Sequence, residues 1–356
     1  MSLRPHFKRH RLPSASFFVP VAPVKRDFLH DLVCPTTGGS LQLVNEKESG
    51  GDILTGTLVS AAGQNYEIVG GIPRLVPQSN YANSFGYQWN KYAKLQLDSQ
   101  NGTTFSRDRF YSITEWAPAD LRGKRVLDVG CGAGRFAEIA LAAGAEVVAV
   151  DLSQAVEACR DNLSSCSRLN IVQASIYDLP FSPGSFDFVY CIGVVQHTPD
   201  PRRSVLEISK MVRPGGHLGY WIYERDWKSY LGTVGFKYLF RPWTRSLSRD
   251  GVENFSNTLE ALCWPLNRVA RKCGLAGKVV MRMLPVASAY LQEIPLSDED
   301  FREWVRLDTF DMYSPAHDHP QKYGEVEKWL TEAGFAVDPR HPHGGISITA
   351  TRPLNA

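Results

Sequence analysis

A strand, a glycine-rich turn and a helix follow one another over residues 126–136, which read VLDVGCGAGRF. The apolar run carries an acid at Asp128, and glycines then alternate at Gly130, Gly132 and Gly134. Because glycine has no Cβ, the chain can turn there with positive φ, and a ligand can approach the backbone closely. A helix that starts after such a turn presents free N–H groups to polar or anionic ligand groups. This order predicts an α/β fold with a ligand beside the end of a strand.

The second expected strand brings another acid to the same place. Residues 147–150 read VVAV, and Asp151 follows them. An acid at this point, about 20 residues after the glycines, suits the two hydroxyls of a ribose. Two simpler interpretations stay open, namely a glycine turn without a ligand and Asp151 as the N-cap of a helix that starts near Ser153. The order of strand, glycine turn, helix, strand and acid favours the ligand.

The spacing Gly-x-Gly-x-Gly, with Asp128 in front, differs from the Gly-x-Gly-x-x-Gly of dinucleotide-binding enzymes. It resembles the first motif of class I S-adenosylmethionine-dependent methyltransferases. The resemblance implies S-adenosylmethionine as the cofactor and Asp151 as the ligand of its ribose. In that family the segment before the first strand often folds over the cofactor, as the aromatic segment 85–89 would do here. The alternative is that these aromatic residues only seal a junction between domains. The cofactor-binding residues expected from the resemblance are Asp128, Gly130, Cys131, Gly132, Gly134, Asp151, Leu152, Ser175, Ile176, Gly193, Tyr87 and Trp89.

Ser175 departs from the pattern of the family. It stands where the family often carries an acid that recognises the adenine amine, shortly before the Leu-Pro-Phe sequence of 179–181. Either Ser175 makes this hydrogen bond or the backbone of Ile176 does. Asp178 is interpreted as a turn or cap residue.

Strands and helices alternate through the rest of the expected core. The expected strands are 169–173, 185–192, 217–223, 335–341 and 345–352, and the expected helices are 202–212 and 325–334. The Arg-Pro-Gly-Gly sequence of 213–216 is a further family resemblance and is expected to form a turn. Alternation of this kind is typical of a three-layer α/β sandwich. The resemblance implies a Rossmann-like methyltransferase sandwich with a seven-stranded, mostly parallel sheet.

Composition and spacing divide the chain into five parts. These are a basic flexible tail at 1–26, a small β-rich unit at 27–77, a connector or cap at 78–120, a methyltransferase core at 121–224 and 321–356, and a helical lid or substrate-binding insertion at 225–320. The β-rich unit resembles the zinc-ribbon-like domain that accompanies some RNA methyltransferases. A zinc ribbon needs four N or S ligands, whereas only Cys34 is present here, so we expect no zinc and a role in packing or partner contact.

The acceptor is expected beyond the carboxyl ends of the strands, where ligands of open parallel sheets bind. Methyl transfer from a sulfonium mainly requires alignment and a dry pocket. A hydroxyl acceptor also needs a base, and histidine suits neutral pH. The candidate catalytic residues are His197, His317 and His319, and the candidate substrate-binding residues are Gln196, Tyr223 and Tyr313.

Two of these histidines also have the residue type of a metal ligand. His317 and His319, together with Asp311, could bind a metal, but alternate residues in a loop need a further ligand in place. No metal is therefore predicted. His341 and His343 could reach the same rim, although a solvated turn accounts for them as well.

Residues 227–249 contain no acid and interleave aromatic residues with Lys and Arg. Such a stripe could contact a membrane surface or bind a lipid-linked or acidic substrate. The simpler interpretation is a helical lid whose apolar residues face inward and whose Lys and Arg face outward.

Charge and composition exclude several classes of protein. The 356 residues carry a net charge of +2, which argues against DNA, and also against RNA, as a partner bound through its phosphates. The seven cysteines form no CxxC pair, a usage typical of reduced thiols. No apolar stretch is long enough to cross a bilayer, so a cytoplasmic location is expected.

The leading hypothesis is S-adenosylmethionine-dependent methylation of a small molecule at O, N or C, in the biosynthesis of a natural product or a surface polysaccharide. An RNA methyltransferase is the first alternative, suggested by the N-terminal unit. A non-catalytic S-adenosylmethionine-binding scaffold protein is the second, which Ser175 favours and the intact glycines and Asp151 oppose.

Overall fold

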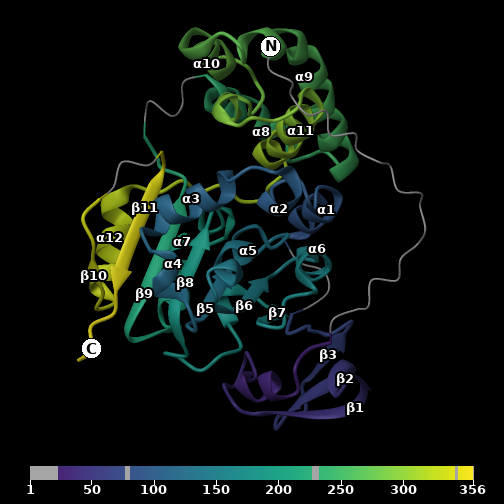
Figure 1. Cartoon of the computed structure of the whole chain (residues 1–356), viewed down its shortest axis with the longest axis vertical. Helices are drawn as coiled ribbons and strands as arrows, with labels where there is room; N and C mark the ends of the chain where they lie inside the picture. Colours follow the sequence, from purple (N-terminus) through teal and green to yellow (C-terminus); the bar gives the residue numbers. More distant parts are fainter. Residues whose placement is uncertain (1–22, 77–80, 227–231, 341–343, 356) are drawn as a thin grey trace, which may run out of the picture.

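Two β-sheets and a group of helices make up the protein (Figure 1). The computed structural model describes residues 23–76, 81–226, 232–340 and 344–355. After a short 3₁₀ helix η1 (Asp27–Asp31), the first sheet is antiparallel and contains β1 (Leu41–Ser49), β2 (Asp52–Ser60), β3 (Asn65–Val69) and β4 (Ile72–Pro73). The second contains β5 (Arg125–Val129), β6 (Glu146–Asp151), β7 (Leu169–Gln173), β8 (Phe186–Ile192), β9 (Val212–Ile222), β10 (Ala336–Val337) and β11 (Ile346–Thr351).

The order of the strands confirms the predicted fold class. The large sheet runs β10-β11-β9-β8-β5-β6-β7, and β5 to β9 pair in parallel while β11 is antiparallel to β9. The chain builds outward from β5 through β6 to β7, and then returns to β8 on the other side of β5. The order therefore reverses between β5 and β8, and their carboxyl ends flank the point where ligands bind in open α/β sheets.

Alternate residues of each central strand face opposite layers of helices. On β5, Val126 packs in one core with α3 (Phe105–Thr114), α5 (Arg135–Ala142) and α6 (Ala155–Leu163). Leu127 packs in the other core with α7 (Pro201–Ser209) and α12 (Tyr323–Glu332). Because side chains of a strand point to opposite faces in turn, continuous apolar runs such as 147–150 are buried on both sides. This arrangement is a three-layer sandwich.

The N-terminal β unit is attached to the edge of the large sheet at β7. The Leu75 N–H donates to the Gln173 carbonyl at 2.8 Å, and the Arg74 Nη1 donates to Gln173 Oε1 at 3.0 Å. Arg74 also forms an ion pair with Glu157 of α6. An edge strand otherwise exposes unpaired backbone groups, so the small unit covers one edge of the larger sheet.

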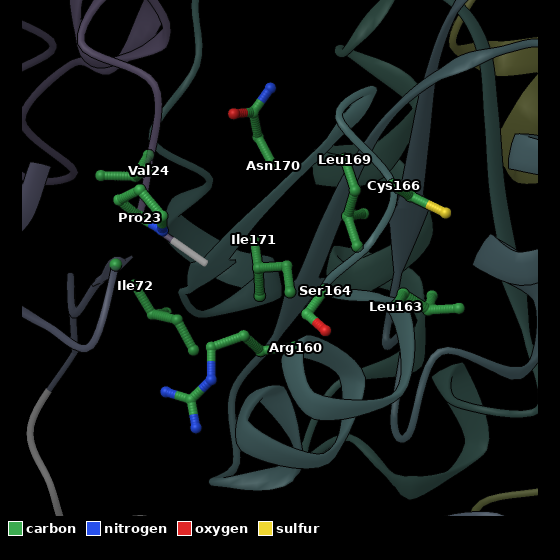
Figure 2. Close-up of a pocket in the computed structure, with 11 residues that line it drawn as sticks. Pro23, Val24, Ile72, Arg160, Leu163, Ser164, Cys166, Leu169, Asn170 and Ile171 are labelled. Carbon is green, nitrogen blue, oxygen red and sulfur yellow. The ribbon is translucent and has the colours of Figure 1, made fainter. Parts of the chain in front are cut away.

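A small cavity lies where the unit meets the amino end of β7 (Figure 2). Its lining includes Val24 and Ile72 of the unit, Ile171 of β7, and Arg160 of α6. Its volume of about 30 Å³ has room for a water molecule or two but not for a nucleoside. It also lies at the opposite end of β7 from Gln173, so it is separate from the predicted ligand site.

A helical insertion follows β9 and lies over the carboxyl ends of the strands (Figure 1). It contains α8 (Thr233–Thr244), α9 (Arg249–Ala270), α10 (Gly274–Arg282), η5 (Ala289–Glu293) and α11 (Asp298–Tyr313). Two clusters of buried apolar side chains, one around Trp304 and one around Tyr313, give it cores of its own. Within the described part of the chain, no helix combines the length and apolarity that crossing a membrane requires.

Two local predictions differ from the structure. Residues 213–216 do not precede the fifth strand but form a bulge inside it, since the pairing with β8 jumps from Val212 to His217. Gly215 adopts a φ of 74°, which lets the extra residues loop out of the ladder. The strand expected over 335–341 is shorter, because β10 pairs with β11 only at Ala336 and Val337; residues 341–343 lie outside the described residues.

Helix α8 also differs from the simple lid expected for 227–249. Lys237 and Arg241 are buried, whereas Leu239 and Trp243 are exposed. The cations therefore face the core of the protein, and part of the apolar surface faces solvent. Residues 227–231 lie outside the described residues.

Candidate functional site

The glycine turn after β5 is shaped by its packing. Gly130 and Gly134 have φ values of 83° and 90°, and a Cβ on them would lie 2.3 Å from Val194 and 2.7 Å from Leu163. Their lack of a side chain therefore serves close packing inside the protein. Gly132, with a φ of 52°, instead faces the Trp89 indole, which would lie 3.3 Å from its Cβ. Trp89 thus covers the turn.

The N–H groups of the turn are less free than the sequence suggested. Gly130 and Cys131 both donate to the Val150 carbonyl, at 2.7 and 3.0 Å. The Gly132 N–H donates to Asp151 Oδ2 at 3.0 Å, and the Gly134 N–H donates to the Cys131 carbonyl. The expectation that this turn offers several free donors is therefore corrected. The hydrogen bonds hold the turn against the end of β6, beneath the Trp89 ring.

Asp151 lies at the tip of β6 and is fixed by three donors. Besides Gly132, the backbone N–H and the hydroxyl of Ser153 donate to Oδ1 at 2.8 and 2.7 Å. Burial nevertheless raises the pKa of Asp151 above its ordinary value, because it disfavours the charged form more than these bonds favour it. The contact with Ser153 shows that Asp151 also holds the turn that leads into α6.

Asp128 is the second acid of the turn and is almost fully buried. The Tyr190 hydroxyl lies near this carboxyl, but Oδ2 makes no hydrogen bond of good geometry with a described residue. Burial, together with the nearby Asp151, raises the pKa of Asp128 to about 8, although the Tyr190 hydroxyl lowers it. A buried acid with an unused oxygen is suited to a cationic ligand group, since a positive charge would stabilise its ionised form.

The remaining predicted cofactor residues line the same edge of the sheet. Ser175 accepts a hydrogen bond from the Tyr177 N–H and caps the short helix η2 (Ile176–Asp178), while Ile176 is buried in the core. The Leu152 carbonyl accepts a bond from Gln173 Nε2 at 3.0 Å. Gly193 follows β8 with a φ of 79° and lies against the Trp221 ring. Asp178 is exposed, which agrees with its interpretation as a turn residue.

His197 lies across from the glycine turn in η3 (Val195–His197), after β8. It is buried, and its Nδ1 lies 3.1 Å from the His317 carbonyl oxygen. Because a carbonyl only accepts, Nδ1 carries the proton in this contact and Nε2 keeps a free lone pair. Burial lowers the pKa of His197 below its ordinary value, with Lys237 adding to this and Asp311 opposing it, so the neutral ring is favoured.

Aromatic rings surround His197. Phe85 and Tyr223 each lie 5.3 Å from it between ring centroids, and Tyr223 also contacts Trp221. The Tyr81 ring meets His317 edge-on at 5.5 Å. These rings come from the connector, the end of β9 and the segment after α11, and they make an aromatic site beside the imidazole.

Buried charges complete this side of the site. Lys237 Nζ bonds Asp318 Oδ1 at 2.7 Å with both side chains almost inaccessible, and it lies 4.9 Å from the Tyr223 ring. The Arg109 guanidinium stacks on Trp221 at 4.3 Å, and burial lowers its pKa. Among the described residues, no carboxylate is in salt-bridge contact with Arg109.

The other predicted acceptor residues fall into three groups. Gln196 is fully buried, and neither atom of its amide has a partner among the described residues. His319 donates its backbone N–H to the Gln196 carbonyl and lies 5.7 Å from the His317 ring. Tyr313 is a correction, because it is buried in the core of the insertion with its hydroxyl on the Pro285 carbonyl, away from the strand ends.

Tyr87 faces the insertion rather than the glycine turn, since its hydroxyl donates to Glu253 of α9 at 2.5 Å. Its neighbour Gln88 also points to the insertion, where Nε2 donates to Asp311 Oδ1 at 3.4 Å. The described residues contain no group of three or more His, Cys, Asp or Glu side chains placed to hold a metal ion. His341 and His343 lie outside the described residues.

The sequence reasoning missed the Lys237–Asp318 pair. Lys237 belongs to the basic aromatic stripe and Asp318 to the polar loop before the last core helix. The many polar and aromatic residues over 308–320 indicated that this segment lies near the site, but they did not indicate which acid pairs with which cation.

Known proteins share this fold and these motifs. Residues 127–219 match the model of a protein family that is described as a methyltransferase domain. The chain is 34% identical to a ubiquinone biosynthesis O-methyltransferase of Thiobacillus denitrificans over 182 residues, which cover 49% of this chain and 75% of that protein. It is 39% identical over 180 residues to the enzyme of the same name from Aromatoleum aromaticum, covering 49% and 73%.

A solved structure is similar over a larger share of the chain. The magnesium protoporphyrin IX methyltransferase of Synechocystis PCC 6803, with S-adenosylhomocysteine bound, aligns with 76% of this chain and 96% of its own, at 16% identity and a TM-score of 0.43.

The topology, the glycine turn and the sequence similarities define the class of the protein. The chain belongs to the class I S-adenosylmethionine-dependent methyltransferases. It is an enzyme that uses S-adenosylmethionine to methylate a small-molecule acceptor.

Proposed function

We propose that the protein methylates a hydroxyl group on an aromatic small molecule, with His197 as the base. The observation that carries this proposal is the state of the imidazole: Nδ1 is held by the His317 carbonyl and the neutral ring is favoured, so Nε2 is free to accept a proton. The rings of Phe85, Tyr223 and Trp221 favour an aromatic acceptor, because aromatic rings pack well edge-on and offset. The relatives are O-methyltransferases by name.

The residues around the glycine turn fit the cofactor. S-adenosylmethionine supplies an electrophilic methyl group on a sulfonium. Asp151 is placed to accept the ribose hydroxyls, and the unused Oδ2 of Asp128 suits a cationic group of the methionine end. Trp89 packs over the turn, because the absent side chain of Gly132 lets the indole approach the backbone closely. Ser175 and Ile176 border the adenine side from η2.

Arg109 would complete the electrostatics of the site. Its guanidinium is half-buried against Trp221, with Asp308 near it but no carboxylate in salt-bridge contact among the described residues, and a desolvated charge of this kind is stabilised when an anion meets it. The methionine carboxylate of the cofactor is an anion present in every turnover. We therefore assign Arg109 to that carboxylate and leave the aromatic side of the site to the acceptor.

The connector and the insertion would cover two sides of this site. The connector 78–120 supplies the cover over the cofactor. Within the insertion 225–320, Lys237 and Arg241 hold the segment 315–318, which would close the acceptor side. Excluding water there would strengthen the electrostatic contacts and protect the reaction from hydrolysis. Gln196, whose amide has no partner among the described residues, is proposed to bind a polar substituent of the acceptor.

The test is a methyl-transfer assay with labelled S-adenosylmethionine and matched phenols, anilines and thiophenols. We expect turnover of phenols, and a His197→Asn variant with kcat lower by roughly 10²-fold or more and an unchanged affinity for S-adenosylhomocysteine. His217→Asn, on β9 and bonded to Thr351, is the matched control and should keep full activity. Turnover of anilines alone, or full activity of His197→Asn, would overturn the proposal.

A further inference from the structure

The helical insertion exposes an unusual amount of apolar surface. Thirteen large apolar side chains are exposed in the described part of the chain, and nine of them lie on or directly after α8, α9 and α10. These nine are Leu239, Trp243, Leu262, Leu266, Val269, Leu275, Val279, Val280 and Met283. Single exposed apolar residues are common on proteins, but a concentration on one group of helices marks an interaction surface.

On α9 and α10 six of these side chains form two exposed rows, one on each helix. Leu262, Leu266 and Val269 follow helical spacing on α9, as Leu275, Val279 and Met283 do along α10 and its C-cap. We call these six residues the apolar face. Exposed fractions of 73% for Leu262 and 80% for Leu275 show that no described part of the protein covers it.

The two helices are held tightly together beneath this face. A Cβ on Gly277 of α10 would lie 1.7 Å from the Ala270 carbonyl at the end of α9, so only glycine permits this approach. The apolar rows of the two helices therefore belong to one rigid helical hairpin.

Helix α9 buries polar residues beside the apolar Val252, Cys263 and Ala270. An ordinary surface helix buries its apolar side and exposes its polar side. Here Ser256, Glu260 and Asn267 face the interior, where Glu260 pairs with Arg302 and Arg306 and Asn267 accepts from Ser288. The contacts of Glu260 and Asn267 place satisfied polar groups inside the insertion, which leaves the apolar residues on the outside for another contact.

The Lys and Arg residues near the apolar face indicate an anionic partner. Residues 232–283 contain nine Lys and Arg against three Asp and Glu. Of these cations, Lys237 and Arg241 are buried, and Arg268, Arg271 and Lys278 pair with Asp298 or Glu293. Among the described residues, Lys272 and Arg282, which are exposed beside the face, take part in no ion pair. A second copy of the chain would bring these like charges together, whereas an anionic surface complements them.

We propose that the apolar face docks on the surface of a membrane that contains anionic phospholipid. Apolar side chains on an exposed helical face, with Lys and Arg beside them, are the combination that seats helices at the boundary of headgroups and acyl chains. Helices α9 and α10 lie at the end of the molecule opposite β1–β4, where a flat surface can reach them (Figure 1). The proposal concerns peripheral docking and does not depend on the acceptor.

The experiment is co-sedimentation of the full chain with vesicles of phosphatidylcholine alone or of phosphatidylcholine with phosphatidylglycerol. We expect binding to the anionic vesicles that weakens as salt is raised, because salt screens the Lys and Arg. The triple variant Leu262→Ser, Val269→Ser, Leu275→Ser should bind at least about tenfold more weakly. Lys272→Glu with Arg282→Glu should remove the preference for the anionic vesicles.

Controls separate docking from misfolding and from self-association. Val69→Ser, an exposed apolar residue on β3, should leave vesicle binding unchanged. Every variant should bind S-adenosylhomocysteine like the original chain, which shows that the fold is intact. Absence of binding to either kind of vesicle would overturn the proposal. So would a dimer in sedimentation analysis that the triple variant abolishes, because the apolar face would then pair with a second copy.

Discussion

At the scale of single residues, the two acids of the glycine turn have different roles. Asp151 is held by Gly132 and Ser153 at the tip of β6, whereas Asp128 is buried with an oxygen that no described residue uses. The first geometry suits an acceptor of hydroxyl hydrogen bonds, and the second suits a nearby positive charge.

Asp151→Ala tests the ribose contact. Losing a charge-assisted hydrogen-bond acceptor should weaken S-adenosylhomocysteine binding by roughly 10- to 100-fold, as measured by titration calorimetry. Asp161→Ala on α6 is the matched control, because its carboxylate is exposed and bonds only to Arg160 among the described residues. Equal affinities in the two variants would remove Asp151 from the cofactor site.

Asp128 makes stability depend on pH in the absence of cofactor. Its pKa is raised from 3.8 to about 8, so the folded state holds a proton that the unfolded state has lost. The stabilisation is complete below about pH 4 and is lost as pH rises through 8. In urea unfolding at pH 6 and at pH 9, the original chain should lose more stability than Asp128→Asn, whose side chain does not titrate. Equal losses would show that Asp128 is ionised in the folded protein.

Residue-level prediction from the sequence succeeded where the chain places partners close together. The glycines and Asp151 meet because parallel neighbouring strands end at one edge of the sheet, which strand periodicity already implies. The prediction that the turn has free N–H groups was wrong, because the Val150 carbonyl, which accepts from Gly130 and Cys131, lies on another strand. The prediction for Tyr313 was also wrong, since nothing in the sequence says which face of α11 points at the strand ends.

At the scale of elements, an ion pair inside the insertion positions the segment that contacts His197. Lys237 of α8 bonds Asp318 in the segment after α11, and Arg241 donates to the Pro315 carbonyl at 2.9 Å. The same segment supplies the His317 carbonyl that holds His197. Strand and helix ranges were predictable from periodicity, but this ion pair was not, because it joins residues 81 positions apart.

Lys237→Met should destabilise the protein by about 3–5 kcal/mol, because it leaves the buried Asp318 carboxylate without its cation. Adding Asp318→Leu should recover much of the loss, since an apolar pair of similar volume replaces a buried ion pair at little cost. The free energies of unfolding of the single and double variants, measured in urea, form a double-mutant cycle. Additive losses would show that the two side chains do not interact.

At the scale of the whole molecule, the N-terminal unit and the large sheet share one core. Phe28 and Leu32 of the unit pack in the same cluster as Phe181 and Phe186. Backbone bonds join the two parts at Leu75–Gln173 and at Val33–Pro180. The sequence predicted the unit as a separate β-rich module, because contacts across a domain junction leave no periodic signal.

Arg74→Ala tests whether this junction also supports the cofactor site. Arg74 donates a hydrogen bond to Gln173 Oε1, and Gln173 Nε2 donates one to the Leu152 carbonyl, next to Asp151 in the chain. Losing partly buried bonds should lower stability by about 1–3 kcal/mol, within a single calorimetric transition, and weaken S-adenosylhomocysteine binding a few-fold. Arg26→Ala, which removes an exposed ion pair inside the N-terminal unit, should change neither quantity measurably. Two separate unfolding transitions in the original chain would mean that the unit folds independently of the sheet whose edge it covers.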